Sequence, residues 1–437
     1  MAAAILLTKN GAKVFLSDSS DKKKLLYLDE QKLDQLNIEF EIGGHTEKIY
    51  DCTFIVISPG IKPDSDIIKK ARSLNIKIIS EIEAASWFCK APIAGITGTN
   101  GKTTTTVLTG EIFKNSARRT EVCGNVGTAF SEVVEELEQD SIAVLELSSF
   151  QLDNIIDLKP AAAAILNISE DHIDWHGSFE NYINAKFKIN MNQGDEDLFI
   201  LNADDEEIMK HSKKSNGIKA GITLSTSMEK SVFERGCYIK DNGIIYFDKG
   251  SEEEIIHRDK INIKGDHNIY NSMAGITIAK HFGVDNDVIR KTLTEFGGVE
   301  HRIEFAGTFN GVTYYNDSKA TNLDSLKVAL KTFKSIVLML GGKSSGNDYD
   351  TIKDLLKGRV RKIIALGEDK DNIFNSLNEA VEVEIADSFE NSVRMAKDSA
   401  VSGDTVLFSP ACKSFDMFTN YEERGNKFKK IVNELNA

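Results

Sequence analysis

A glycine-rich turn, Thr97–Thr104 (TGTNGKTT), separates a short apolar run from a helical segment. Small residues in such a turn let backbone N–H groups surround the oxygens of a phosphate, and the following helix N-terminus adds a favourable dipole. We expect Lys102 to pair with the β- and γ-phosphates of a nucleotide and Thr103 to bind Mg²⁺. Ile96 occupies the first glycine position of the pattern G-x-x-x-x-G-K-[ST], so a Gly/Thr-rich turn without a ligand is the alternative.

Short β-rich runs alternate with helical stretches along three successive blocks of the chain, which is typical of parallel βαβ units. A length of 437 residues is also typical of two to three domains. We therefore predict three α/β domains, over residues 1–90, 91–298 and 299–437. The expected strands are Ala12–Asp18, Asp51–Gly60 and Asn75–Glu81, then Ser141–Ser149, Ala161–Ser169 and Asp197–Asp205, then Gly311–Asp317, Ser335–Gly342, Lys362–Gly367, Val381–Asp387 and Asp404–Ala411.

Two local signals refine this pattern. Residues Ala2–Lys9 are predicted to form a helix capped by Gly11, so the first domain lacks the strand that normally opens a βαβ unit. Asn242-Gly243 lies between two β-rich runs, which is a strong hairpin signal. The hairpin predicts a small antiparallel appendage on the otherwise parallel sheet of the central domain.

Composition excludes several classes of protein. The net charge of −14 argues against a chain that wraps nucleic acid or coats an anionic membrane. No apolar run approaches the 18 residues typical of a membrane span, and the N-terminus lacks the features of a signal peptide. Five widely spaced cysteines without a C-x-x-C pair are typical of reduced thiols. We expect a cytoplasmic protein with no nucleic-acid or membrane partner.

Polar residues follow two of the expected central strands. Glu146 lies at the end of one, where ligands bind in open parallel sheets, and is a candidate Mg²⁺ ligand. Asp171 and His172 follow the next strand and are candidates for contact with Mg²⁺ and phosphate. Asp174 and His176 extend that cluster and raise the possibility of zinc, but H-E-x-x-H and a clear third ligand are absent from the sequence. A helix cap or solvated turn is the alternative for Glu146.

Further polar positions have both a structural and a functional interpretation. Asn268 and Asn271 start a helix, where capping explains one asparagine and contact with a base or ribose explains two. Arg302 and its neighbour His301 have a functional role only if they contact a nucleotide; otherwise Arg302 is a surface charge. Many polar residues follow two expected strands of the third block, over Asn316–Asn322 and Ser409–Asp416. They are candidates for ligand contact, and the alternative is that they only form turns.

Taken in order, these segments resemble the Mur ligase family over nearly the whole chain. The motifs that carry the resemblance are TGTNGKTT, ELSSFQL, NISEDHIDWH, GDHNIYN, VEHRIE, NDSKATN and SPACKSFDMFTNYEERGNKF. The last two, with ELSSFQL, point to the branch that adds D-glutamate. The resemblance implies an ATP-dependent ligase that activates the carboxylate of UDP-N-acetylmuramoyl-L-alanine as an acyl phosphate, which the D-glutamate amine attacks. It also implies a monomer working in cytoplasmic peptidoglycan synthesis.

Site residues follow from the resemblance motif by motif. It implies an N-terminal Rossmann-like domain for UDP, a central P-loop ATPase-like domain and a C-terminal Rossmann-like domain for the amino acid. It implies two Mg²⁺ ions, and it makes Lys186, which is otherwise an ordinary helix lysine, a carbamylated metal-bridging residue beside Glu146, Thr103 and His172. Lys102, His172, Lys186 and Lys319 would be catalytic. ATP would contact Gly98, Thr99, Asn100, Gly101, Lys102, Thr103, Thr104, Asn268, Asn271, His301, Arg302 and Asp317. Substrates would contact Asp18, Ser19, Ser58, Pro59, Gly60, Asn125, Ser148, Thr321, Ser414, Phe415 and Tyr421.

The sequence departs from the family at two places. Relatives begin with a strand and a glycine-rich turn before the helix at Ala2, so half of the UDP site is expected to be incomplete, and a wrongly assigned start codon would explain the difference. Relatives also often carry Lys or Arg three residues beyond Gly341-Gly342, where this chain has Ser345 and where Lys343 is a candidate substitute.

Two other functions are consistent with parts of the sequence. A non-catalytic P-loop nucleotide sensor explains the glycine-rich turn but gives no role to the polar strand ends of the third block. A folylpolyglutamate synthase-like enzyme also adds glutamate, but that family starts near its ATP site. Turnover that depends on the amino acid would separate a ligase from a sensor.

Overall fold

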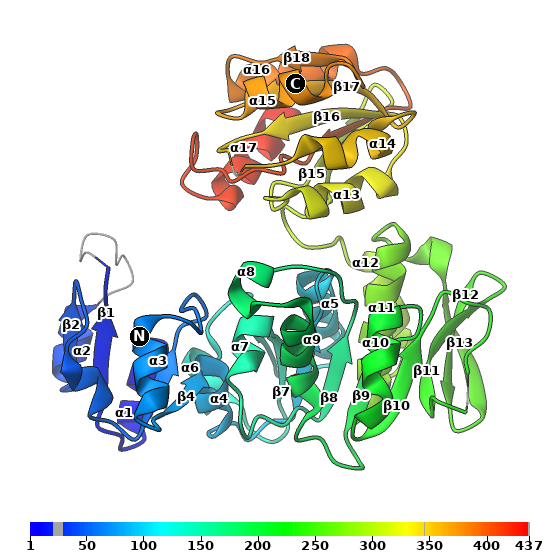
Figure 1. Cartoon of the computed structure of the whole chain (residues 1–437). Coiled ribbons are helices and arrows are strands. Elements are labelled where there is room, and N and C mark those ends of the chain that lie inside the picture. The colour runs from blue at the N-terminus through cyan, green and yellow to red at the C-terminus, as the bar shows by residue number, and fades with distance from the viewer. Residues whose placement is uncertain (21–28, 230, 345, 436–437) are drawn as a thin grey trace. The chain divides into compact units, whose positions relative to one another are not determined.

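The structure of the chain is a computed structural model that describes residues 1–20, 29–229, 231–344 and 346–435. It divides into two compact units (Figure 1). The first unit comprises Met1–Ile261 and Asp266–Phe296, and the second comprises Asn262–Gly265 and Gly297–Ala437. The first two predicted domains lie in the first unit, except for residues 262–265 and 297–298, which belong to the second. The residue boundaries predicted for the three domains stay predictions.

The large sheet of the first unit has nine strands within the described residues, in the order β13-β12-β11-β10-β9-β8-β5-β7-β6. Neighbouring strands from β6 to β11 pair in parallel. Buried apolar residues fill the strands at its centre, so helices cover both faces. The strands are β5 Ile93–Thr97, β6 Thr120–Gly124, β7 Ile142–Glu146, β8 Ala162–Ile165, β9 Leu198–Asn202, β10 Ile218–Ile222, β11 Arg235–Lys240, β12 Gly243–Asp248 and β13 Ser251–His257.

The predicted hairpin is confirmed at Asn242. Strands β11 and β12 pair antiparallel from Lys240↔Gly243 outward, and Asp241 and Asn242 both have positive φ, 48° and 66°. A two-residue loop with positive φ at both positions matches the twist of the flanking strands. The hairpin and β13 extend the parallel sheet at one edge and do not form a separate layer.

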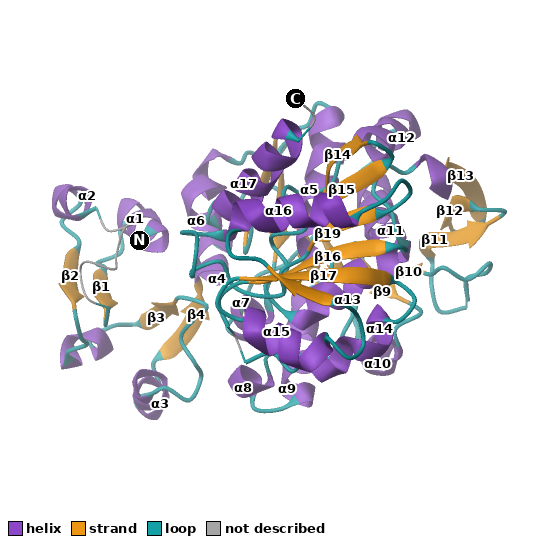
Figure 2. Ribbon diagram, turned by 90° about the horizontal axis from the view of Figure 1, so that it is seen from above, coloured by secondary structure: helices purple, strands orange, loops and turns teal. Residues whose placement is uncertain are grey.

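Helices of the central region surround this sheet. Helix α11 packs on α5, which follows the glycine-rich turn, and Figure 2 shows the hairpin strands at the far edge from the N-terminal block. The helices of the first unit are α1 Ala2–Lys9, α2 Glu30–Gln35, α3 Asp66–Ser73, α4 Glu81–Ser86, α5 Lys102–Asn115, α6 Phe130–Val133, α7 Ser149–Asp153, α8 Ile173–His176, α9 Phe179–Phe187, α10 Glu206–His211, α11 Asp266–His281 and α12 Asn286–Glu295.

The N-terminal block begins with the predicted helix α1, which Gly11 follows with φ +87°. Its described strands form two parallel pairs in separate sheets, β1 Phe15–Asp18 with β2 Glu39–Ile42, and β3 Phe54–Ile57 with β4 Lys77–Ser80 (Figure 2). Strand β2 was not predicted, because only four residues form it and charged residues alternate with apolar ones.

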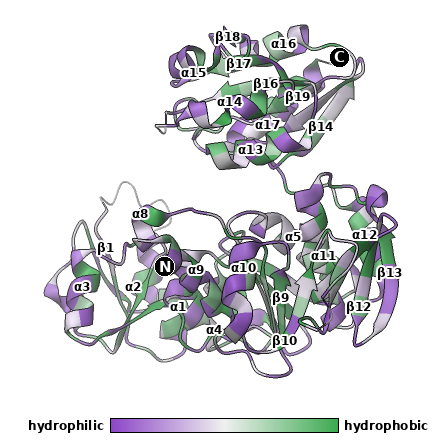
Figure 3. Ribbon diagram, turned by 45° about the vertical axis from the view of Figure 1, so that its right-hand side comes forward, coloured by the Kyte–Doolittle hydropathy of each residue, from purple (hydrophilic) through white to green (hydrophobic). Residues whose placement is uncertain are grey.

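The second unit has a six-stranded sheet within the described residues, in the order β14-β15-β19-β16-β17-β18. All pairs except the antiparallel β14–β15 are parallel, and Figure 3 colours the inner strand β16 as hydrophobic. The strands are β14 Glu304–Phe309, β15 Val312–Asn316, β16 Ile336–Gly341, β17 Val360–Leu366, β18 Val383–Ile385 and β19 Thr405–Phe408, and the helices are α13 Leu323–Thr332, α14 Lys353–Leu356, α15 Lys370–Leu377, α16 Phe389–Ser399 and α17 Tyr421–Glu434. No helix in the described part of the chain is both long and apolar enough to cross a membrane.

Candidate active site

The carboxyl ends of three neighbouring strands form the centre of the candidate site in the first unit. Strand β5 lies between β7 and β8, so Thr97, Glu146 and the residues after Ile165 come to the same edge of the sheet. Parallel strands place their carboxyl ends together, which is where ligands bind in such sheets. The adjacency of β5 and β7 places Glu146 at the same edge of the sheet as the glycine-rich turn.

The phosphate loop, which we define as Gly98–Lys102, connects β5 to α5. Gly98 and Gly101 have φ of +152° and +83°, conformations that side-chain-bearing residues rarely adopt. Asn167, after β8, holds the loop: its backbone oxygen accepts from Thr99 N at 2.9 Å and its Oδ1 accepts from Asn100 N at 2.8 Å. Sequence reasoning missed Asn167, because an asparagine after a strand reads as a turn residue.

Lys102 is the first residue of α5, and its side chain turns back over the phosphate loop. Nζ donates to the backbone oxygens of Gly98 and Thr99 at 3.0 and 2.9 Å. The following residues Thr103 and Thr104 are buried at the start of the helix. The ammonium group therefore lies at a helix N-terminus, where a phosphate is also favoured.

Asn271 lies directly under the phosphate loop. A Cβ atom on Gly101 would lie only 2.5 Å from Asn271 Oδ1, and that oxygen accepts from Thr105 Oγ1 at 3.1 Å. Asn271 Nδ2 donates to Asn268 Oδ1 at 3.0 Å, and both side chains are buried. Asn271 therefore joins α11 to α5, and Asn268 fixes the Asn271 side chain within α11. The predicted contacts of both asparagines with ATP stay predictions.

Glu146 presents a buried carboxylate with unused bonding capacity. Its side chain is 2% exposed, and Oε1 accepts from Asn125 Nδ2 at 2.8 Å. Oε2 is buried without a hydrogen-bond partner among the described residues. A buried carboxylate oxygen with no partner is unfavourable unless a cation binds it, so Glu146 suits Mg²⁺.

Lys186 projects from α9 toward the same loop. Its side chain is 1% exposed, and Nζ donates to Gly98 O at 2.8 Å. Burial, reinforced by the charge of Lys102, lowers the pKa of the Lys186 ammonium well below its usual value. A neutral amine is a nucleophile, whereas an ammonium is not.

The segment after β8 places Asp171 and His172 near this centre. His172 has φ 52°, its Nε2 lies 3.5 Å from Asp171 Oδ2, and its ring packs 4.8 Å from that of Phe150. His176 is buried, its Nε2 lies 2.9 Å from Ser149 Oγ, and burial lowers its pKa to about 4. Among the described residues, no group of three His, Cys, Asp or Glu side chains is placed to hold a metal.

Ser148 and Asn125 have structural partners as well. Ser148 caps α7, where Gln151 completes a capping box, so its side chain has the role of a helix cap. Asn125 follows β6 and is tied to Glu146 by its backbone N, which donates to Glu146 O at 2.9 Å. The predicted substrate contacts of both residues stay predictions.

The predicted UDP residues lie at strand ends of the N-terminal block. Asp18 ends β1, and its Oδ1 accepts from Ser20 N at 2.8 Å, which spans Ser19. Ser58, Pro59 and Gly60 follow β3 in a turn that Ile61 N closes on Ser58 O at 3.1 Å. Their positions are those expected of a ligand site at the carboxyl edge, and their contacts with UDP stay predictions.

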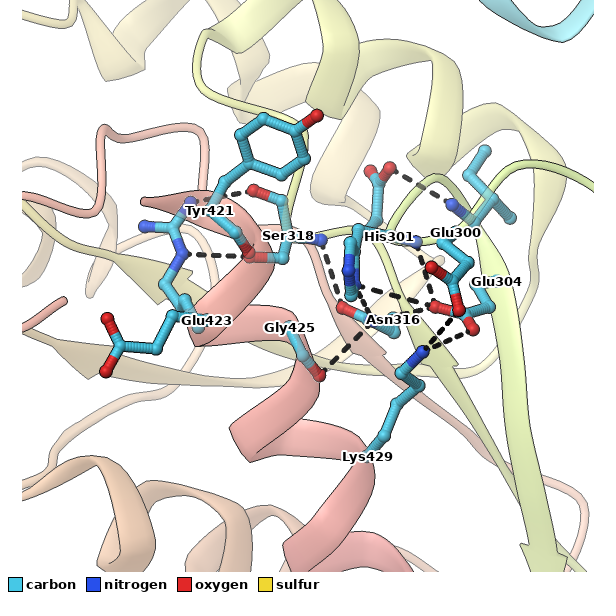
Figure 4. A network of polar contacts seen from close by, with 12 residues as sticks. Glu300, His301, Glu304, Asn316, Ser318, Tyr421, Glu423, Gly425 and Lys429 are labelled. Atoms are coloured by element: carbon cyan, nitrogen blue, oxygen red, sulfur yellow. Dashed lines mark hydrogen bonds and ion pairs between the residues drawn. The ribbon is translucent and has the colours of Figure 1, made fainter. Parts of the chain in front are cut away.

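A buried polar network lies at the end of β15 and the start of β14 in the second unit (Figure 4). Asn316 Nδ2 lies 2.9 Å from His301 Nδ1 and donates to Glu304 Oε2 at 2.9 Å. Lys429, from α17, reaches Glu304 Oε1 at 2.8 Å. His301 is 3% exposed, and burial lowers its pKa. His301 is therefore part of a buried network within this unit, and its predicted contact with ATP stays a prediction.

Asp317 is buried at the end of β15. Its Oδ2 accepts from Ser409 Oγ at 2.7 Å and its Oδ1 from Ile303 N at 3.2 Å. Burial raises the pKa of Asp317 to about 6, and the nearby Arg302 opposes that rise. The predicted residues Asp317 and Arg302 are thus brought together, as are Ser409 and Asp317 from the two polar sets.

The remaining predicted residues of the second unit lie around the same edge. Lys319 Nζ lies 5.6 Å above the ring of Tyr421, the first residue of α17. Thr321 precedes Asn322, which caps α13, so at least one residue of the polar set Asn316–Asn322 has a structural role. Ser414 is buried and Phe415 is 61% exposed. The departure noted at Ser345 lies outside the described residues.

Arg424 is a residue that sequence reasoning missed. It is 0% exposed on α17 and donates to Ser318 O at 2.7 Å, to Ser318 Oγ at 3.0 Å and to Cys412 O at 3.0 Å. It therefore connects the ends of β15 and β19. A single arginine in an amphipathic helix reads as solvated, so the sequence carries no signal for this role.

Three domain models match successive parts of the chain. They are the MurD N-terminal domain over residues 3–67, the Mur ligase middle domain over residues 96–279 and the Mur ligase glutamate ligase domain over residues 301–412. Curated relatives are similar over nearly their whole length. The UDP-N-acetylmuramoylalanine–D-glutamate ligase of Salinibacter ruber is 40% identical over 99% of this chain and 95% of its own. The enzyme of that name from Chloroherpeton thalassium is 40% identical over 100% and 96%.

Solved structures share the fold. The MurF ligase of Thermotoga maritima in complex with ADP has a TM-score of 0.61 at 15% identity, covering 99% of each chain. The UDP-N-acetylmuramate–alanine ligase MurC of Thermotoga maritima has a TM-score of 0.59 at 20% identity, covering 99% of this chain and 96% of its own.

Proposed function

Because the chain belongs to the Mur ligase family, we propose that it joins D-glutamate to UDP-N-acetylmuramoyl-L-alanine and converts ATP to ADP and phosphate. The family resemblance and the three-domain α/β fold expected from the sequence are confirmed. The relatives that are 40% identical over nearly the whole chain bear the name of this reaction. The structural observation that supports it most is the phosphate loop beside a buried carboxylate, Glu146, one oxygen of which has no partner in the described part of the chain.

The reaction has two steps. The substrate carboxylate attacks the γ-phosphorus of ATP, which forms a C–O–P bond and releases ADP. The neutral amine of D-glutamate then attacks the acyl carbon, and phosphate leaves with one former carboxylate oxygen while the amine loses a proton. A carboxylate needs this activation because it is otherwise a poor electrophile.

The phosphate loop supplies most of the catalytic charge in this account. Lys102 leaves the backbone oxygens of Gly98 and Thr99 and pairs with the phosphate oxygens of ATP, where it stabilises charge in the transition state. Asn167 bonds the backbone of the loop and Asn271 lies against Gly101, so the loop backbone is already in place for a nucleotide and only the Lys102 side chain has to move.

Magnesium fits the acidic side of the loop. Glu146 Oε2 and the Thr103 hydroxyl would bind one ion, and His172 lies with the residues proposed for a second. Mg²⁺ neutralises the phosphates and polarises the transferred group when it is bound. Asn125 holds the Glu146 carboxylate in place at 2.8 Å.

Lys186 is proposed to react with CO₂ and become a carbamate. The C–N bond forms between Nζ and the CO₂ carbon, the amine loses one proton, and a cation is replaced by an anion that ligates metal. Burial lowers the Lys186 pKa and so favours the neutral amine that this reaction needs. With ¹³C-bicarbonate we expect a protein-bound carbamate signal in the NMR spectrum that Lys186→Ala lacks. Small carboxylic acids should partly restore the activity of Lys186→Ala, and the absence of both effects would contradict the carbamate.

Substrates are proposed to bind at the strand ends of the outer domains. The UDP moiety is assigned to Asp18, Ser19 and the turn Ser58–Gly60, and D-glutamate to the region of Lys319, Thr321, Ser414, Phe415 and Tyr421. ATP would also contact Arg302, Asp317 and His301 of the second unit. We propose in addition that the enzyme is a monomer of the cytoplasm, consistent with its net charge of −14.

The assignment is tested by ADP release with each combination of substrates. We expect ADP only when UDP-N-acetylmuramoyl-L-alanine and D-glutamate are both present. Equal turnover with L-glutamate or a folate acceptor, or turnover that is independent of the amino acid, would overturn the assignment. Lys102→Ala should abolish ADP release. The matched control is Lys114→Ala, because Lys114 lies on the same helix, is exposed and pairs only with Glu111 in the described contacts.

A further inference from the structure

Tyr270 lies on α11 between Asn268 and Asn271, and the proposed reaction gives it no role. Its hydroxyl donates to Asp204 Oδ2 at 2.6 Å. Asp204 follows β9, and β9 runs parallel to β8, whose carboxyl end borders the phosphate loop. The bond therefore joins the start of α11 to the edge of the large sheet at which the phosphate loop lies.

The Asp204 carboxylate has a defined orientation although the residue is exposed. Its Oδ1 accepts from Thr223 Oγ1 at 2.5 Å, and its Oδ2 also accepts from Leu224 N at 2.8 Å. Both donors lie directly after β10. The Tyr270 hydroxyl thus bonds an acceptor that two neighbouring strand ends already hold in place.

The end of β9 is also connected to the phosphate loop. The backbone N of Asp204 donates to Asn202 Oδ1 at 3.0 Å, and Asn202 Nδ2 donates to Leu166 O at 3.0 Å. Leu166 N donates to Thr97 O at 3.0 Å, and a Cβ atom on Gly98 would lie 3.1 Å from Leu166 Cβ. Asn202 is 6% exposed, so this connection is shielded from water.

Helix α11 is therefore attached to the region of the phosphate loop at two adjacent residues. Asn271 bonds Thr105 and lies against Gly101, and Tyr270 bonds Asp204. Adjacent residues of an α-helix project in directions about 100° apart, so two such attachments resist rotation of the helix about its axis. The Tyr270 bond thereby helps to set the direction in which the asparagine side chains project.

We propose that Tyr270 and Asp204 form a positioning pair that orients α11 for nucleotide binding. This inference rests on the proposed function, because ATP is the ligand that Asn268 and Asn271 are expected to contact. The pair acts through those asparagines and touches none of the reacting atoms. Its loss should weaken nucleotide binding and leave the chemical step and the other substrates unaffected.

The test combines steady-state kinetics with ADP titration of the full-length enzyme. Tyr270→Phe removes only the hydroxyl, so it should raise the KM for ATP and the dissociation constant for ADP about fivefold, within the effect of one hydrogen bond to a charged group. The kcat and the KM for the UDP substrate should stay unchanged. Tyr238→Phe is the matched control, because Tyr238 lies on the hairpin strand β11 and its hydroxyl also bonds a carboxylate, that of Glu252.

A double-mutant cycle tests whether the tyrosine acts through its partner. Asp204→Ala should raise the ADP dissociation constant at least as much, and adding Tyr270→Phe to it should have no further effect, because both changes remove the same link. If the wild type releases no ADP with both substrates, the proposed function is contradicted, whereas the ADP titration still tests the pair. An unchanged ADP affinity in Tyr270→Phe, an equal loss in Tyr238→Phe, or additive effects in the double variant would each overturn the proposal.

Discussion

At the scale of single residues, the candidate site contains charged side chains that burial would disfavour without a partner. Glu146, Lys186 and Asp317 are all at most 3% exposed. Glu146 Oε2 has no hydrogen-bond partner among the described residues, and burial lowers the pKa of Lys186 and raises the pKa of Asp317. Groups of this kind cluster at functional sites because a ligand completes their interactions.

Asn125 is expected to control metal affinity through Glu146. Asn125→Ala removes the 2.8 Å hydrogen bond that orients the carboxylate, so the apparent affinity for Mg²⁺ in ADP release should fall about tenfold. Asn115→Ala, which removes a 2.9 Å bond to Thr292, serves as the control. If Asn125→Ala raises only the KM for the UDP substrate, the asparagine contacts substrate and does not position the metal ligand.

His176 is expected to make stability depend on pH. Its pKa of about 4 in the folded state lies below the value of about 6.5 in the unfolded chain. The unfolded state therefore binds a proton first, and the free energy of unfolding falls as the pH drops from about 6.5 toward 4. His176→Gln, which can still bond Ser149, should show a smaller loss between pH 7 and pH 5 in urea unfolding. An identical loss in both proteins would assign the effect to other groups.

At the scale of elements, strand ends and helix starts position the chemistry. The phosphate loop takes its shape from β5, β8, α5 and α11 together, through Asn167 and Asn271. A substitution that alters the contacts between these elements should therefore change the conformation of the phosphate loop, even when each helix and strand stays folded.

Gly101→Ala tests this sensitivity. The substitution strains a φ of +83° and also places a methyl group 2.5 Å from Asn271 Oδ1, so the loop must shift. We expect kcat/KM for ATP to fall about a hundredfold, as for other small displacements of positioning groups. Gly283→Ala is the matched control, because Gly283 has φ +76° and no atom of the described residues lies within 4 Å of a new Cβ. Equal losses in the two variants would show that backbone strain alone is responsible.

Glu83 connects α4 to the segment after α7. Its carboxylate accepts from the backbone N of Ile156, Asp157 and Leu158 at 3.0, 2.8 and 3.0 Å, and from Trp87 Nε1 at 2.9 Å, at 0% exposure. Glu83→Gln places an amide donor against these donors and should lower the free energy of unfolding by about 3 kcal/mol. Glu138→Gln, at an exposed pair with Lys90, should change it little. Comparable stability of both variants in urea would contradict a specific role for Glu83.

The sequence predicted elements that carry a strong local pattern. Apolar runs ending in polar residues located β5, β7, β8, β15, β16 and β19, and the Asn-Gly signal located the hairpin. Short strands with exposed alternating residues, such as β2 and β14, lacked that pattern. Glu83 and Arg424 were missed because each has partners distant in sequence. Glu83 accepts from backbone groups 73 to 75 residues away, and Arg424 donates to Ser318, 106 residues away. The family resemblance, and not a local pattern, identified Lys186.

At the scale of the whole molecule, the chain assigns different tasks to its parts. The first unit holds the phosphate loop, Glu146 and Lys186, and the second unit presents its own polar strand ends around Asp317 and Lys413. A ligase that activates one substrate and receives another needs both kinds of site.

The formation of an acyl phosphate is tested most directly by isotope transfer. The carboxylate of UDP-N-acetylmuramoyl-L-alanine is labelled with ¹⁸O, the enzyme is supplied with ATP and D-glutamate, and the released phosphate is analysed by mass spectrometry. The account predicts one ¹⁸O atom in each phosphate, because the oxygen that bridges carbon and phosphorus leaves with phosphorus. Phosphate without the label, released at the same rate as the amide product, would contradict it.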